Sequence, residues 1–349
     1  MHDWQVPPKY LSFLSQMLRR PFEETGPELL VALCNQIALM SQIEMNRDQL
    51  IKDKVLVPLI DLLRSDDDVL LLSVAKALVN LSSSNLIAKD SIVNEGGVRA
   101  VIPHLLNKPH ELTRAFCVLL KNCLTAPELR ERIINDGAIA PLVRLLHKTE
   151  IKDAQRGDAV VAAAAAAVWN LVAFQGAKNM VVKERAVRWG WGRGSGSRPS
   201  GVNGLRVKVA RVCSFHASFA DIGMLTGECP PLWLQVEALV SQLHESRSQD
   251  VWQKCSGCLM VLAANSDKVK ALAGQEGAIS ELAAILRKSE HNKPTLKAAL
   301  GALAVLTSDE KNVQKLRQEG IALDTYAKDK DERIQMFVSQ LMDRLYGQE

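Results

Sequence analysis

Aromatic residues are scarce in this chain of 349 residues: they make up 5% of the sequence, whereas hydrophobic residues make up 47%. A core with that balance is filled mainly by leucine, valine and alanine, which is typical of packed helices rather than of sheets. No apolar run reaches the roughly 18 residues that a membrane span requires. The N-terminus has no signal-peptide pattern, and His2 stands where N-myristoylation requires glycine. We therefore expect a helical protein with no membrane anchor.

Cysteine motifs and catalytic motifs are also largely missing. The seven cysteines show no framework spacing, which favours a reducing compartment and thus a cytoplasmic location, with the nucleus as the alternative. Cys255 and Cys258 form a CxxC inside an expected helix, and no second CxxC exists, so we interpret them as core thiols rather than as a redox or metal site. No G-x-S-x-G, H-E-x-x-H or phosphate-loop sequence occurs. We expect no enzyme, no metal and no cofactor.

The feature that the sequence does have is a repeat of roughly 42 residues. Gly96 and Gly137 lie 41 residues apart, and Gly277 and Gly320 lie 43 apart. Each unit is predicted to hold three helices: a short helix ending at the glycine, an amphipathic second helix and a longer third helix. Glycine suits the junction because it tolerates positive φ where the chain turns sharply. A single unit cannot bury its own apolar face, so we expect the units to stack into one solenoid.

The repeats resemble those of the armadillo superfamily over residues 28–182 and 236–325. The resemblance is carried by the glycine turns and by third-helix cores of the type Ala-Leu-Val-Asn-Leu at 77–81, with related sequences at 119–123, 167–171, 258–262 and 302–306. It implies an all-α, right-handed superhelical solenoid of about six three-helix units. The expected organisation is an N-terminal cap at 1–27, repeats at 28–184, a disordered insert at 185–235, and repeats with a C-terminal cap at 236–349.

The insert interrupts one unit where a glycine turn is due. Its composition of Gly, Ser, Arg and Trp cannot bury a core, so we expect disorder. It could be an arm that binds RNA or an acidic surface, a flexible regulatory loop, or translated non-coding sequence; the flanks join into one repeat unit without it, which favours the last. The insert holds seven basic and two acidic residues, so the rest of the chain has a net charge near −1 although the total is +4. Basic character is therefore no argument for nucleic-acid binding by the solenoid.

The third helices are the candidate binding surface, because in armadillo proteins they line the concave face. A recurrent asparagine there can bond the backbone of an extended partner peptide; in this chain it is Asn80, Asn122 and Asn170. Lys76 and Lys254 are expected to tune the charge preference. Replacing the asparagines should then affect binding more than stability. The alternative is that these amides satisfy only local backbone groups.

A narrower resemblance is to Smg GDS proteins, armadillo proteins that bind small GTPases and stimulate GDP dissociation. It covers consecutive runs at 51–65, 69–80, 96–105 and 115–122. It implies a Rho- or Ras-like GTPase with a basic prenylated tail as partner, which the acidic run Asp66–Asp68 would suit. Smg GDS chains are longer than this one, and no short motif carries over individual functional residues.

Three functions follow from these observations. The first is a protein-interaction scaffold that binds an extended segment. The alternative is a small-GTPase regulator, either an exchange factor or a chaperone of prenylated GTPases. The remote alternative is a nucleic-acid or nuclear-import role through the basic insert. Nuclear-import adaptors of the importin type carry a tryptophan one turn before the recurrent asparagine, and this chain lacks it; Trp169 is instead adjacent to Asn170.

Overall fold

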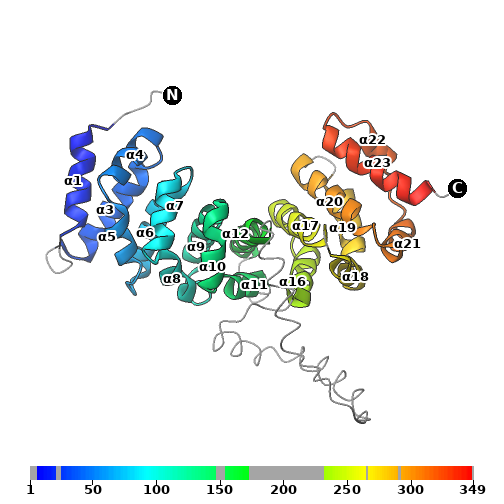
Figure 1. The fold of residues 1–349 in the computed structure, drawn as a ribbon, viewed down its shortest axis with the longest axis horizontal. Coiled ribbons are helices and arrows are strands. Elements are labelled where there is room, and N and C mark those ends of the chain that lie inside the picture. Colours follow the sequence, from blue (N-terminus) through cyan, green and yellow to red (C-terminus); the bar gives the residue numbers. More distant parts are fainter. Residues whose placement is uncertain are drawn as a thin grey trace, which may run out of the picture.

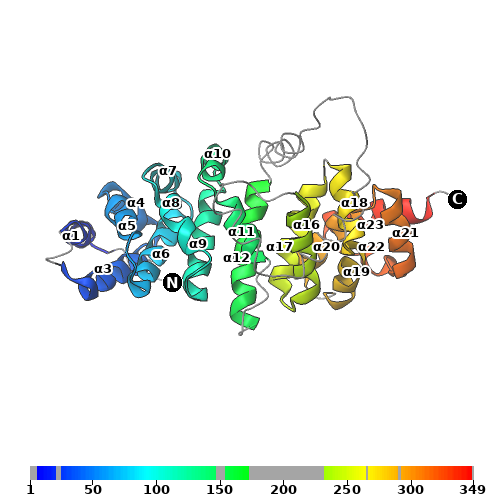
Figure 2. The ribbon, with the colours of Figure 1, turned by 90° about the horizontal axis from the view of Figure 1, so that it is seen from below.

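The computed structural model describes residues 6–20, 25–146, 154–172, 232–264, 266–289 and 292–347. These residues form an elongated, curved array of helices, with the N- and C-terminal helices at opposite ends (Figures 1 and 2). No strand occurs among them, which confirms the all-α solenoid. Within these ranges, no helix combines the length and apolar character needed to cross a bilayer.

The third helices form one continuous row along the whole array. They are α3 (Pro27–Met40), α6 (Asp68–Ser82), α9 (His110–Cys123), α12 (Ala154–Val172), α17 (Gln249–Ala263), α20 (Lys293–Leu306) and α23 (Glu332–Tyr346). Each packs against the next one in this order, and the row is visible in Figure 2. Their facing sides carry leucine, valine, alanine and cysteine, nearly all fully buried. All five predicted third-helix cores therefore lie in this row.

The first and second helices cover the other side of that row. The first helices are α4 (Glu44–Lys52), α7 (Leu86–Asn94), α10 (Pro127–Asn135), α18 (Asp267–Gln275) and α21 (Glu310–Glu319). The second helices are α5 (Leu56–Leu62), α8 (Gly97–Val101) with the 3₁₀ turn η1 (Ile102–His104), α11 (Ile139–Leu146), α16 (Leu232–Glu245), α19 (Ala278–Lys288) and α22 (Asp324–Ala327). The second helix that follows Gly96 is split into α8 and η1 because Pro103 has no N–H to donate within a helix.

The expected glycine turns all have left-handed backbone conformations. The φ values are +83° at Gly96, +90° at Gly137, +88° at Gly277 and +59° at Gly320. Lys54, 42 residues before Gly96, has φ +56° and is the one non-glycine residue with positive φ in the described chain. The unit that begins with α4 therefore makes the same turn without glycine, in a backbone conformation that is unfavourable for a residue with a side chain.

The row of third helices continues across the interrupted unit, because α12 packs directly against α17. The second helix expected from Val236 begins at Leu232, so the boundary predicted at residue 235 falls inside α16. Gln235 is 2% exposed there, which corrects its assignment to the insert. Gln235 therefore belongs to the solenoid rather than to the insert. Residues 173–231, which hold the rest of the expected insert, lie outside the described residues.

Helices at both ends close the array. α1 (Pro8–Leu18) packs on α3 and α4, with Leu11 and Leu14 buried against them. α23 packs on α20 and α22 through Ile334, Val338 and Leu341. Both helices have an exposed face as well, as terminal repeats of a solenoid require.

Candidate functional site

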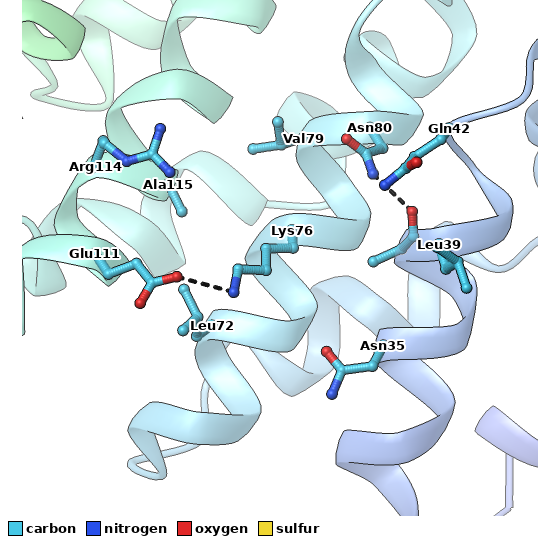
Figure 3. A pocket seen from close by; sticks show the side chains of 11 residues that line it. Asn35, Leu39, Gln42, Leu72, Lys76, Val79, Asn80, Glu111, Arg114 and Ala115 are labelled. Carbon is cyan, nitrogen blue, oxygen red and sulfur yellow. Dashed lines mark hydrogen bonds and ion pairs between the residues drawn. The ribbon is translucent and has the colours of Figure 1, made fainter. Parts of the chain in front are cut away.

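A hollow of about 390 Å³ lies on the outer surface of three neighbouring third helices, α3, α6 and α9. We call it the third-helix groove; its lining residues are Asn35, Ala38, Leu39, Gln42, Leu72, Lys76, Val79, Asn80, Glu111, Arg114 and Ala115. Figure 3 shows polar side chains from all three helices around an apolar floor. The groove combines amide groups, both signs of charge and exposed leucine, which suits a peptide better than a small polar metabolite.

Lys76 and Glu111 form an ion pair across the groove. The Nζ–Oε1 distance is 3.0 Å, and the two side chains are 47% and 58% exposed (Figure 3). Exposed pairs of this kind are weak and exchange easily with other charged groups. The pair joins α6 to α9, and Lys76 is exposed in the lining of the groove.

The three recurrent asparagines each donate to the preceding third helix. Asn80 Nδ2 lies 2.7 Å from the carbonyl oxygen of Ala38. Asn122 Nδ2 lies 3.1 Å from the carbonyl oxygen of Val79, and Asn170 Nδ2 lies 3.1 Å from that of Lys121. The same bond thus recurs in three consecutive units, near the C-terminal ends of helices whose last carbonyls lack a partner within the helix.

These bonds give the asparagines a structural role, as in the alternative in which the amides satisfy backbone groups, although each carbonyl belongs to the neighbouring unit. Asn122 is the most buried of the three: it is 7% exposed, and its amide also donates to Ser82 Oγ at 3.3 Å. Asn80 and Asn170 are half-buried. The Oδ1 atoms receive no hydrogen bond from any described residue, so each amide has an acceptor left for a partner. Of the three, only Asn80 lines the groove together with Lys76.

Lys254 lies further along the row, away from the groove. Its Nζ is 6.0 Å from the centre of the Trp169 ring and 3.9 Å from Asp250 Oδ1. The ring itself rests on Gly257, where a Cβ atom would come within 2.5 Å of two ring carbons. Lys254 therefore covers the contact between α12 and α17, and its charge is shared between a tryptophan face and a carboxylate.

The acidic run Asp66–Asp68 does not line the groove. Asp67 caps α6 by accepting from the backbone N–H of Val69 at 2.8 Å, and Asp68 pairs with Lys108 at 2.7 Å. Two of the three carboxylates are thus used within the fold. The run does not supply the acidic groove that a basic tail would need.

The CxxC cysteines are core residues. Cys255 and Cys258 are fully buried, and Cys258 Sγ donates to the carbonyl oxygen of Ala165 at 3.2 Å. Burial raises the pKa of the Cys255 thiol to about 12 and that of Cys258 well above its usual value. Among the described residues, no group of three or more histidine, cysteine, aspartate or glutamate side chains is placed to hold a metal ion.

Of the eleven groove residues, the sequence analysis named only Lys76 and Asn80, and it missed the two charged residues Glu111 and Arg114. Both lie at the start of α9, ahead of the core motif that identified the helix. The signal was present, because residues 111, 114, 118 and 122 follow the helical spacing that places them on one face. Extending each third helix backward from its asparagine would have found them.

Comparison with known proteins agrees with this architecture. No family model matches the chain. A designed armadillo repeat protein aligns with a TM-score of 0.59 at 18% identity, covering 83% of this chain and 99% of that one. Another, in complex with peptide (KR)4, aligns with a TM-score of 0.57 at 17% identity, covering 85% and 99%. The described chain therefore has the armadillo-repeat fold.

One curated relative also matches in sequence. It is Rap1 GTPase-GDP dissociation stimulator 1-B of Xenopus laevis, which is 29% identical over 118 residues. The match spans 32% of this chain and 19% of that protein, so this chain covers about a fifth of the relative. The predicted resemblance to GDP-dissociation stimulators thus reappears, over a limited segment.

Proposed function

We propose that this protein is a non-enzymatic interaction scaffold whose third-helix groove binds an extended segment of a protein partner. The observation that carries the proposal is the unbroken row of third helices, with a hollow across α3, α6 and α9 and an asparagine Oδ1 left over in three units. An extended peptide crossing such a row could bond each amide in turn. The designed armadillo protein in complex with (KR)4 supports this mode of binding for the fold.

The test is to capture a partner from native lysate, identify it, and titrate it against variants by calorimetry. Asn35→Trp fills the groove from an exposed position on α3, and Gln36→Trp adds the same side chain to an exposed position beside it that does not line the groove. We expect Asn35→Trp to weaken binding at least tenfold and Gln36→Trp to leave it unchanged. Equal affinities of the two variants for the partner would show that the binding site does not lie in the third-helix groove.

The asparagines provide a second measurement. If each bonds the partner backbone, a single alanine replacement should weaken binding several-fold, because one such bond contributes about 1 kcal/mol net. Replacing Asn80, Asn122 and Asn170 together should cost on the order of 3 kcal/mol of binding free energy if the sites are independent. Affinities must be compared under conditions in which circular dichroism shows each variant folded, since the same amides also bond neighbouring helices.

The second candidate function is regulation of a small GTPase. The match to the Xenopus GDP-dissociation stimulator supports it, together with the order of repeats that resembles Smg GDS proteins. The test is to load Rap1 with fluorescent GDP and follow its release with and without this protein in excess. Faster release would support the regulator; an unchanged rate, with no complex on gel filtration, would count against it. Both candidates predict a cytoplasmic location, which cell fractionation would check.

A further inference from the structure

The third-helix groove carries an excess of positive charge. Lys76 and Glu111 neutralise each other at 3.0 Å. Arg114 lines the same hollow, is exposed, and has no ion-pair partner among the described residues (Figure 3). A guanidinium cannot lose its charge near neutral pH, so the groove presents one fixed, unmatched cation.

A second unmatched cation lies on the same helix. Lys121 is seven residues after Arg114, which places it on the same face of α9 two turns further on. Its side chain has no partner among the described residues. The lysines of later third helices differ in this respect: Lys254 faces Asp250 at 3.9 Å, and Lys297 pairs with Asp331 at 2.8 Å. Among the lysines of the described third helices, Lys121 is therefore the one without a carboxylate partner, and it shares α9 with Arg114.

We propose that the groove recognises an extended acidic segment, with a carboxylate of that segment paired with Arg114. This inference rests on the proposed function and names the chemistry of its partner. Arginine is suited to the role because its planar guanidinium can donate two parallel hydrogen bonds to the two oxygens of a carboxylate. Lys76 supplies a second cation, since its half-exposed pair with Glu111 is easily rearranged. The amides of Asn35, Gln42 and Asn80 surround the hollow and can bond the segment's backbone.

The positive charge of the groove disfavours two kinds of basic ligand. The designed armadillo protein in complex with (KR)4 holds a cationic peptide, and a GTPase with a basic tail would present the same sign. Either would meet Arg114 and Lys76 in the groove, where Glu111 is the one acidic residue of the lining. Like charges at such short range oppose binding.

The experiment compares three fluorescein-labelled octapeptides: (Glu-Asp)4, (Lys-Arg)4 and the neutral (Ser-Gln)4. Fluorescence anisotropy at low salt gives their affinities for the full chain. We expect (Glu-Asp)4 to bind most tightly and to lose at least tenfold in affinity with Arg114→Glu, about 1.4 kcal/mol. Arg64→Glu is the matched control, because Arg64 is 73% exposed, lies outside the groove, and its replacement changes the net charge equally.

The outcomes separate this inference from the function on which it rests. Equal loss in Arg114→Glu and Arg64→Glu would mean that only overall charge matters, and would overturn the inference. So would binding of (Glu-Asp)4 that survives Arg114→Glu, which would place the peptide elsewhere, such as on the arginine-rich residues 185–235. If (Lys-Arg)4 or (Ser-Gln)4 binds better and Asn35→Trp abolishes that binding, the groove is a peptide site of different specificity. If Asn35→Trp affects neither the peptides nor the captured partner, both proposals fail.

Discussion

Trp169 packs directly on Gly257, so that two neighbouring third helices touch through a tryptophan ring and a bare backbone. A Cβ atom at Gly257 would lie 2.5 Å from two ring carbons and 2.8 Å from a third. No side chain fits at that separation without movement of the ring. The pair sits at the join between α12 and α17, the two helices that keep the row continuous across the interrupted unit.

Gly257→Ala should therefore lower the stability of the fold. Glycine inside a helix normally costs about 1 kcal/mol relative to alanine, so the change would stabilise α17 if space were available. Overpacking against the ring costs about 1–3 kcal/mol, and we expect this loss to exceed the gain in helix propensity. Denaturant unfolding followed by circular dichroism measures the difference. In a Trp169→Leu background the same glycine change should become neutral or stabilising; an unchanged loss there would contradict the role of the ring.

Lys54→Gly should raise the free energy of unfolding by about 1 kcal/mol, because Lys54 holds the left-handed conformation that costs a side chain about that much. The four glycines at the corresponding turns show what the position favours. Lys52→Gly is the control: Lys52 lies in the last turn of α4, where glycine should lower stability. If Lys54→Gly and Lys52→Gly lowered the free energy of unfolding by similar amounts, the left-handed conformation at Lys54 would not be unfavourable.

Buried thiols should make stability fall at high pH. Cys117 is fully buried, and burial raises its pKa to about 12. Unfolding returns the thiol to its ordinary pKa, about 8.5. Between these values the folded state keeps the proton that the unfolded state releases, so stability is full below the lower pKa and declines as pH rises toward the upper one. Cys117→Ala should reduce the slope above pH 9.5 by about 1.4 kcal/mol per pH unit. An identical slope would mean that the thiol titrates freely in the folded protein.

Local sequence signals were sufficient for the repeat and its turns. Glycine spacing located Gly96 and Gly137 because the requirement for positive φ depends on a single residue and its neighbours. The same rule missed Lys54, where a strained residue takes the glycine's place. The third-helix asparagines were also found by position. The carbonyl that each one bonds belongs to another unit, 42 to 49 residues away, and is brought close only by stacking of the units.

The groove depended on contacts that no local pattern contains. Asn35, Lys76 and Arg114 come from three different units, and their meeting at one hollow follows from the angle and spacing between stacked helices. The sequence placed Lys76 near a binding surface but could not show that Glu111 neutralises it while Arg114 stays unmatched. Pairing of charges across units decides the chemistry of the groove.

Deleting residues 185–231 and restoring a Gly-Gly turn should leave the solenoid intact. The contact between α12 and α17 joins the two halves, and α16 begins at Leu232, so the deletion stops at the edge of the described helix. We expect an unchanged helical spectrum and an equal or higher melting temperature. A deletion that also removes Leu232–Gln235 is the comparison, since it takes a buried glutamine from α16 and should lower the melting temperature. Loss of the fold in the shorter deletion would show that residues 185–231 are needed for packing.

Asn122→Ala should destabilise the fold more than Asn80→Ala does. Asn122 is 7% exposed and donates to both the Val79 carbonyl and Ser82 Oγ, so its loss removes two hydrogen bonds at a position that water reaches poorly. Each such bond contributes about 1 kcal/mol net. Asn80 is half-buried, and water can replace its bond to Ala38. Urea unfolding of both variants gives the comparison, with the partner titrations run on the same preparations. Equal, negligible losses of stability would favour the partner-binding role over the alternative in which the amides satisfy backbone groups. A large loss at Asn122 with unchanged affinity would instead make its amide a structural contact between neighbouring units.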